Sequence, residues 1–279
     1  MLNLLLKKQL ILENKLVILV FLLYNKRQEV IKLIKTEEEI NLIREASYIV
    51  SETHKYMKDF IKPGITTREL DKLAEDFIIS KGANASCKGY EGFPAAICIS
   101  INDEVVHGIA SDRRLKDGDI VTLDIVADKN GYHGDSGWTY PVGKISKEDE
   151  YLLEHTEKAL LEGLKVLKPG IRIGDLACAI QTYAESKKLS VVRELTGHGI
   201  GRSMHELPDV PNYGHKNTGL VIKEGMVLAV EPMLNYGRKD IGVLEDDWTI
   251  VTLDGKNSAH FEHTVVVTKD GCEILTKRI

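Results

Sequence analysis

Four segments of the chain place apolar residues at helical spacing. In the first of them, Ile40, Ile43, Ala46 and Ile49 recur at intervals of three and four residues, which puts them on one face of a helix. Three of the segments open with a Ser or Thr three positions before an acidic residue, a spacing that caps helix N-termini. The predicted helices begin near Thr36, Thr66, Ser146 and Gly174.

Shorter apolar runs, rich in β-branched and aromatic residues, are typical of β-strands. We expect strands at residues 96–101, 120–127, 132–142, 226–231, 248–252 and 261–268. Because the helical and strand segments come in mixed groups rather than in strict alternation, the pattern predicts an α+β fold with a largely antiparallel sheet.

One sequence pattern occurs twice. Lys-Pro-Gly-Ile at residues 62–65 returns at 168–171, and residues 116–124 align with residues 223–231. The offsets of the two matches, 106 and 107 residues, are nearly the same, and the second match ends with a carboxylate on a carboxylate. We interpret the repeat as two similar halves related by a pseudo-twofold axis. A site between such halves would receive ligands from both of them.

Composition narrows the class of protein only a little. Hydrophobic residues make up 43% of the chain and charged residues 28%, as in an ordinary globular protein. The formal net charge of -5 provides no basic field for nucleic-acid binding. The cysteines form no CxxC pair, so we expect reduced thiols in a cytoplasmic protein rather than a structural zinc site or a disulfide framework. They are Cys87, Cys98, Cys178 and Cys272.

The N-terminal 29 residues have a different character. Glu13 and Lys15 separate two apolar runs, and the longer run, residues 16–24, is about half the length needed to cross a bilayer. No small-residue cleavage site follows it. We therefore expect residues 1–29 to be an extension outside the fold rather than a membrane anchor, and residues 30–279 to form one domain.

Two aspartates lie on neighbouring predicted strands, on either side of the turn sequence Asp-Lys-Asn-Gly at 128–131. A two-residue loop at 129–130 would place Asp124 directly opposite Asp135, and a loop at 130–131 would place them diagonally on the same face. A three-residue loop would put them on opposite faces. Like charges that lie close together persist if one takes up a proton or if a cation lies between them. The alternative is a pair of solvated acids on an edge hairpin.

Three further residues could contribute to the same chemistry. His198 stands between two glycines, which let the backbone approach a neighbour closely, although a plain glycine turn is the commoner explanation. Glu231 ends an apolar strand and precedes a proline, and Glu262 opens another apolar strand. A buried carboxylate in such a strand is unfavourable unless it is paired or binds a metal.

The chain resembles the type I methionine aminopeptidases of the pita-bread fold. The resemblance runs from about residue 31 to residue 274, and the ordered set of motifs is specific although each motif is weak alone. The matching segments are residues 87–94, 99–109, 118–121, 134–136, 196–201, 204–206, 230–233 and 261–264. The resemblance implies two pseudo-symmetric halves with antiparallel sheets covered by helices. Family members of this minimal kind begin near Val30, so we hypothesise that Val30 is the true start.

The resemblance also implies a centre of two divalent metal ions. Asp124 would bind one ion, His198 and Glu231 the other, and Asp135 and Glu262 would bridge both. This oxygen-rich ligand set suits manganese, iron or cobalt, and zinc is also compatible. In such a centre the metals polarise the peptide carbonyl and activate a water for attack on the first peptide bond.

Residues beside the proposed metals have implied roles as well. Glu231 would be the proton shuttle, and His107 and His205 match the family's two active-site histidines that contact the substrate. His263 is interpreted as a supporting residue rather than a ligand. The other histidines have no motif around them and are expected at the surface. They are His54, His133, His155, His215 and His260.

An apolar slot for methionine completes the implied site, because soft and aromatic side chains suit a thioether. Ordinary core packing is the alternative, above all for Cys98. Phe93 and Met204 differ from the residues that the family often has, but both keep the slot apolar. The implied lining consists of Cys87, Tyr90, Phe93, Cys98, Met204 and Trp248.

The function implied by the resemblance is removal of the N-terminal methionine from nascent proteins. The implied partner is the N-terminal methionine of the substrate, with transient ribosome association, no direct contact with nucleic acid or membrane, and a monomeric chain. One alternative is an Xaa-Pro aminopeptidase or prolidase, which shares the fold and the five-ligand plan. The other is a non-catalytic pita-bread protein that binds peptides or ribosomes.

Overall fold

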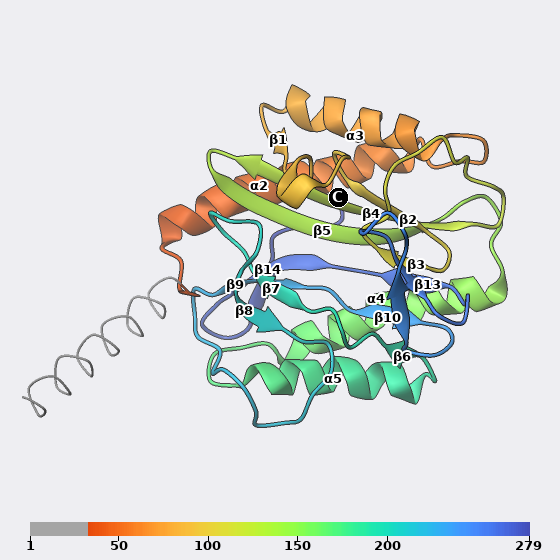
Figure 1. The fold of residues 1–279 in the computed structure, drawn as a ribbon. Helices are drawn as coiled ribbons and strands as arrows, with labels where there is room; N and C mark the ends of the chain where they lie inside the picture. Colours follow the sequence, from red (N-terminus) through yellow and green to blue (C-terminus); the bar gives the residue numbers. More distant parts are fainter. Residues whose placement is uncertain (1–32) are drawn as a thin grey trace, which may run out of the picture.

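The structure, a computed structural model, describes residues 33–279 (Figure 1). The predicted N-terminal extension and the hypothesised start at Val30 lie outside the described residues. Within the described part of the chain, no helix is long and apolar enough to cross a membrane. The helical elements are α2 (Glu37–Lys58), α3 (Thr67–Ser80), η1 (Tyr90–Gly92), α4 (Lys147–Val166) and α5 (Ile173–Ser186).

The predicted capping signals are confirmed. At the start of α2, the Glu39 backbone N–H donates to Thr36 Oγ1 (3.2 Å), and the Thr36 N–H donates back to the Glu39 carboxylate (3.0 Å). The same reciprocal pair opens α3, and Ser146 caps α4. The fourth helix starts earlier than predicted, because Arg172 is the N-cap of α5. Gly174 lies in the first turn, where a Cβ atom would come within 2.4 Å of His215 O.

The strands pair in antiparallel fashion throughout residues 33–279, as predicted. The strands are β1 (Asn84–Ala85), β2 (Cys98–Ile101), β3 (Glu104–Val106), β4 (Ile120–Lys129), β5 (Tyr132–Pro141), β6 (Ser190–Val191), β7 (Gly197–Gly199), β8 (Glu206–Val210), β9 (Val227–Val230), β10 (Met233–Asn235), β11 (Ile241–Val243), β12 (Ile250–Thr252), β13 (Ser258–His260), β14 (His263–Val267) and β15 (Cys272–Ile274). Several are shorter than predicted, and two candidate acids, Glu231 and Glu262, consequently lie just beyond strand ends.

The sequence repeat corresponds to a repeated backbone structure. In the first half, the Gly64 N–H donates to Leu115 O (2.8 Å), and in the second half the Gly170 N–H donates to Ile222 O (2.9 Å). Both glycines have φ values that favour glycine, +96° and +93°. Helices α3 and α5, each of 14 residues, follow these turns. The two halves therefore have the same turn followed by a helix of the same length, at positions that are 106–107 residues apart.

The strands form the middle of the molecule, and the helices cover its outer faces (Figure 1). Helix α2 packs on β4 and β5, whereas α4 packs on β10 and β13. Each half has its own apolar core, one around Leu123 and Ile125 and the other around Leu228 and Val230. The halves meet where β5 lies beside β14, because the Glu262 N–H donates to Gly137 O (2.7 Å). The candidate carboxylates lie along this seam.

Candidate metal centre

The β4–β5 hairpin fixes the relation of the two aspartates. Its turn is Asn130-Gly131, with φ values of 55° and 76°, and tight hairpin turns favour this pair. Asp124 therefore pairs with Gly137, and Asp135 pairs with Val126. Of the loops considered from the sequence, the one at 130–131 is present. The acids lie diagonally on the same face rather than directly opposite.

Both aspartates place a carboxylate oxygen in the interior. Within residues 33–279, neither Asp124 Oδ1 nor Asp135 Oδ1 has a hydrogen-bond partner although both atoms are buried. Burial raises the pKa of Asp124 to about 6. Burial, and next the charge of Asp124, raises the pKa of Asp135 well above its ordinary value. The solvated edge hairpin considered for these acids is therefore wrong.

The glycines around His198 allow three strands to pack closely. A Cβ atom at Gly197 would lie 2.3 Å from Ala229 O, and one at Gly199 would lie 2.1 Å from Leu207 O. His198 Nδ1 lies 2.9 Å from Gly199 O, a carbonyl that only accepts, so Nδ1 carries the proton in this contact. Burial lowers the pKa of His198 to about 4. The ring is therefore neutral at pH 7, and its Nε2 lone pair is free to bind a metal.

Two glutamates of the second half, Glu231 and Glu262, lie near the His198 ring. Glu231 Oε1 lies 3.5 Å from His198 Nε2, and Asp135 Oδ2 lies 3.8 Å from the same nitrogen. Glu262 is 2% exposed, and its Oε1 has no hydrogen-bond partner in the described residues. Burial is the main cause that raises the pKa of both glutamates well above the ordinary value, and the neighbouring acids add to it.

The donor set fits a divalent cation. Ligand atoms of Asp135, His198 and Glu262 all lie within 4.8 Å of one another. Glu231 Oε1 lies 3.5 Å from His198 Nε2, and Asp124 lies diagonally across the β4–β5 hairpin from Asp135, on the same face. Buried carboxylates that lack hydrogen bonds and lie beside a neutral imidazole are the environment in which a cation relieves like-charge repulsion. The structure thus groups three of the predicted ligands and places the other two, Glu231 and Asp124, next to them.

The two other predicted active-site histidines lie beside this group. The His205 ring lies 4.4 Å from the His198 ring, edge to face, and its Nδ1 is 2.8 Å from Tyr90 Oη. His107 has a φ of +59°, a left-handed conformation that is uncommon outside glycine, and its ring lies 6.4 Å from that of Trp248. Burial lowers the pKa of both histidines, so both are neutral at pH 7.

An apolar wall adjoins the carboxylates. Phe93 and Trp248 are in edge contact at 5.1 Å, and Cys98 pairs with Asp124 across β2 and β4. All four cysteines are free thiols, as expected. The wall unites the six residues predicted to line the slot with Ala95, Ile109, Ala110 and Val126. The predicted six are Cys87, Tyr90, Phe93, Cys98, Met204 and Trp248.

The surface prediction fails for three histidines. His54 is fully buried and hydrogen-bonded to Tyr140 and Ser136, and His155 is 8% exposed beside Tyr183. His260 is 1% exposed, and burial lowers its pKa to about 3. The absence of a motif says nothing about burial, which for His54 and His155 depends on contacts with residues far away in the sequence. His260 precedes Glu262 by two positions, a spacing that puts both side chains on one face and could have revealed it.

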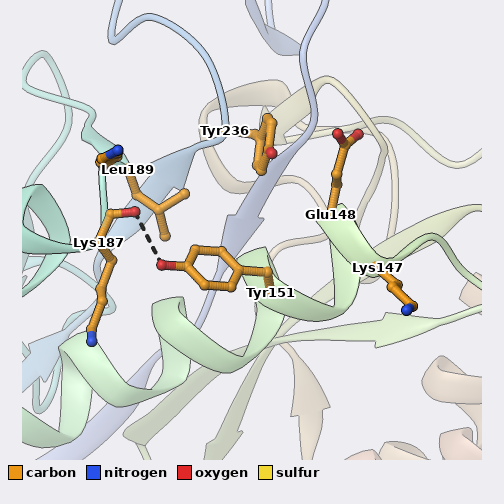
Figure 2. Close-up of a pocket in the computed structure, with 7 residues that line it drawn as sticks. Lys147, Glu148, Tyr151, Lys187, Leu189 and Tyr236 are labelled. Carbon is orange, nitrogen blue, oxygen red and sulfur yellow. Dashed lines mark hydrogen bonds between the residues drawn. The ribbon is translucent and has the colours of Figure 1, made fainter.

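A pocket of about 440 Å³ lies apart from this group, where α4 begins and α5 ends (Figure 2). Lysines and tyrosines line it, and Tyr151 Oη donates to Lys187 O (3.3 Å). In the part of the chain that the structure describes, its lining includes none of the predicted ligands or wall residues. The pocket therefore has no part in the candidate centre.

The sequence and the structure of this chain are both similar to those of known proteins. The sequence model of metallopeptidase family M24 matches residues 41–269. Methionine aminopeptidase 1 of Bacillus subtilis is 55% identical over 243 residues, which are 87% of this chain and 98% of that protein. A methionine aminopeptidase structure from Rickettsia prowazekii superimposes with a TM-score of 0.87 at 44% identity, covering 88% of this chain and 99% of that one.

A prolidase from Pyrococcus furiosus is also similar, with a TM-score of 0.73. Its identity is only 25%, and the match covers 90% of this chain but 67% of the prolidase. Both structures have the pita-bread fold, so the predicted fold class is confirmed. The prolidase alternative is not favoured, because the identity to the other group is higher and the coverage nearly complete.

Proposed function

We propose that this chain, which belongs to metallopeptidase family M24 and within it to the methionine aminopeptidases, removes the N-terminal methionine from newly made polypeptides. The observation that carries the proposal is the buried group of Asp135, His198 and Glu262, with Glu231 and Asp124 next to it and an apolar wall directly beside it. Such a group supports metal-assisted hydrolysis, and the wall supports recognition of an apolar first residue.

Enzymes of this family use divalent metal ions, and five residues of this chain would hold them. They would be Asp124, Asp135, His198, Glu231 and Glu262. When bound, the ions would polarise the peptide carbonyl and increase the acidity of water. Manganese, iron, cobalt and zinc are all compatible with four carboxylates and one imidazole.

The remaining chemistry belongs to the chain's own side chains. The Glu231 carboxylate would accept a proton from the attacking water and pass it to the leaving amine. Its closeness to His198, 3.5 Å, supports a place at the reacting atoms. His107 and His205 would donate hydrogen bonds to the substrate carbonyl and to the oxyanion that develops from it. Their neutral state supports this role, since a neutral imidazole keeps one N–H to donate.

The apolar wall would hold the methionine side chain. Cys98 connects the two parts of the site, because it belongs to the wall and pairs with Asp124. A methionine seated against the wall would therefore have its scissile bond close to the carboxylates. The thiols of Cys87 and Cys98, together with the aromatic edges, are favourable contacts for a thioether.

The biological setting forms part of the same proposal. A substrate with a free N-terminal methionine is a nascent chain, so we infer action in the cytoplasm and transient contact with ribosomes. The four free thiols support a reducing compartment. We also propose that the chain acts as a monomer, because residues from its own two halves supply every predicted ligand.

Peptide hydrolysis provides the test. Protein loaded with Mn²⁺ is incubated with Met-Ala-Ser and with an Ala-Pro peptide, and released amino acids are quantified. We expect release of methionine only, loss of release after chelation, and recovery when Mn²⁺ is returned. Cleavage of the proline peptide alone would overturn the proposal. Cleavage of neither peptide, with no metal retained, would favour a binding protein instead.

A further inference from the structure

His260 is the buried polar side chain near the metal centre that the proposed function does not use. Its ring is 1% exposed, and neither Nδ1 nor Nε2 has a hydrogen-bond partner within residues 33–279. Burying an imidazole with both nitrogens unpaired is unfavourable, and an apolar side chain would fill the same space without that cost. The ring therefore has a reason for its place other than packing.

Both backbone polar groups of His260, the N–H and the C=O, hydrogen-bond to the Thr139 side chain. The His260 N–H donates to Thr139 Oγ1 (2.9 Å), and the Thr139 hydroxyl lies 2.9 Å from His260 O. The ring itself lies against Gly137, where a Cβ atom would come within 2.5 Å of His260 Cε1. Any larger residue at 137 would displace the imidazole. The ring position is thus determined by β5 of the first half, although the residue belongs to the second.

The internal repeat relates His260 to a proposed metal ligand. The offset of 107 residues that aligns Asp124 with Glu231 also aligns Val126 with Met233. In the first half Val126 pairs with Asp135, and in the second half Met233 pairs with His260. His260 therefore occupies the sheet position that corresponds to Asp135. Its side chain accordingly lies at the edge of the same centre.

The nearest charged partner of His260 is Glu262. Their closest atoms, His260 Nε2 and Glu262 Oε2, are 3.7 Å apart, which is close but longer than a hydrogen bond. The other oxygen of this carboxylate, Oε1, is buried and has no hydrogen-bond partner in the described residues. The two oxygens thus have different surroundings, one beside an imidazole and one available to a cation.

We propose that His260 is a positioning residue: its Nε2, 3.7 Å from Glu262 Oε2 in this structure, comes within hydrogen-bond distance of that oxygen in the metal-loaded protein, donates its proton to it and so orients this carboxylate for the metal ions. The inference rests on the proposed function, because it assumes that Glu262 is a metal ligand. Outer hydrogen bonds of this kind fix the orientation of a ligand, and their loss typically weakens metal binding by about 10- to 100-fold. His260 acts through Glu262 and has no contact with the substrate in this proposal.

The test compares His260→Ala, His260→Gln and a control, His215→Ala, whose imidazole is exposed. Metal-free protein is titrated with Co²⁺, and binding is followed by the visible absorption of the bound ion, which reports coordination independently of turnover. Turnover of Met-Ala-Ser at saturating Co²⁺ gives kcat and KM. Thermal unfolding of each metal-free variant shows whether it is folded.

We expect His260→Ala to weaken Co²⁺ binding by about 10- to 100-fold, to alter the absorption spectrum and to lower kcat while KM stays nearly constant. His260→Gln, whose amide can donate a similar hydrogen bond, should recover most of the affinity and the spectrum. His215→Ala should match the original protein in every measurement.

Three results would overturn the inference. They are unchanged affinity and spectrum in a folded His260→Ala variant, a glutamine variant no better than the alanine variant, and a rise in KM with unchanged metal affinity. The last result would identify a substrate contact instead. Failure of the proposed function would look different, because the unaltered protein would then bind no Co²⁺ or release no methionine.

Discussion

The two halves of the molecule share one backbone plan but supply different chemistry. Gly64 and Gly170 make the same turn with the same hydrogen bond, and a helix of equal length follows each. At matched sheet positions, however, the first half has Asp135 where the second has His260. The repeated backbone thus brings side chains to one seam, while the residue types at the matched positions decide what each side chain does there.

The difference extends to how each half places its acids. Asp124 lies within the long β4–β5 hairpin, whereas Glu231 and Glu262 lie just beyond the ends of β9 and β14. The first half also supplies most of the apolar wall, and the second half supplies the imidazole of His198. A symmetric frame has therefore produced an asymmetric site, in which one half alone would be incomplete.

The largest expected effect comes from removing Glu262, which in our proposal is a bridging metal ligand supplied by the second half. Glu262→Ala should lose both metal stoichiometry and turnover, with kcat/KM down by at least about 10³-fold, a size typical of lost catalytic groups. Elemental analysis and peptide hydrolysis measure the two losses. Burial raises the pKa of Glu262, which means that the folded metal-free protein disfavours the charged carboxylate. Removing this carboxylate should therefore leave the metal-free protein at least as stable at pH 7.

The matched control for this variant is Glu273→Ala. Glu273 is an acid of neighbouring β15 that is paired with Arg44 at the surface, 3.0 Å away. It should change neither metal content nor turnover. Normal turnover and full metal occupancy in Glu262→Ala would refute the bridge and would leave the first half as the main source of ligands.

A smaller effect is expected at the apolar wall, which both halves build. Phe93→Ala from the first half and Met204→Ala from the second each remove a buried apolar contact worth about 1.5–3 kcal/mol. Each should lower kcat/KM for Met-Ala-Ser by about 10- to 100-fold while metal content stays the same. Altered metal content with unchanged kcat/KM would show that these residues support the centre rather than bind the substrate.

The starts of the helices could be predicted from the sequence, whereas the strand register and the buried side chains of the site could not. Thr36 with Glu39 and Thr66 with Glu69 are local signals, so the helix starts could be identified without tertiary contacts. The sequence is compatible with several hairpin loops, and the strand pairing, with positive φ at Asn130 and Gly131, decides between them.

The ligand set shows a further limit of sequence. Spacing alone does not select four acids and one imidazole that lie far apart in the chain, and only the family resemblance groups them. His54 was misplaced at the surface because its burial depends on Tyr140 and Ser136, more than eighty residues away. Local patterns carry no information about such contacts.

Acid stability offers the next comparison between the halves. Burial lowers the pKa of His54, on α2, to about 3, so its unfolded form binds a proton below about pH 6.5 and its folded form does not. Stability from this group is full above pH 6.5 and falls toward pH 3, by up to about 1.4 kcal/mol per pH unit. His54→Gln should flatten the urea-unfolding free energy between pH 6.5 and 4.

The counterpart test uses His155, on α4. Burial lowers the pKa of His155 as well, but less than it lowers the pKa of His54. His155→Gln should therefore flatten the pH dependence of the unfolding free energy less than His54→Gln does. Equal slopes in the two variants would contradict the assignment of the larger burial effect to the first half.

The smallest expected effects should be equal in the two halves. Gly64→Ala and Gly170→Ala each force a side chain into a left-handed conformation, with no heavy atom within 4 Å of the new Cβ. Each should lower the free energy of unfolding by about 1–2 kcal/mol. Gly271→Ala, which also meets open space but has no positive φ, should change it less. Unequal losses at Gly64 and Gly170 would show that the repeated turn differs in its contribution to stability.

The most direct test of a centre shared between the halves is a crystal structure of the Mn²⁺-loaded protein with anomalous diffraction. We predict two anomalous peaks, one bound by Asp124 and the other by His198 and Glu231, with the Asp135 and Glu262 carboxylates in contact with both. Peaks that contact ligands from one half only, or no peak among these five side chains, would contradict the account.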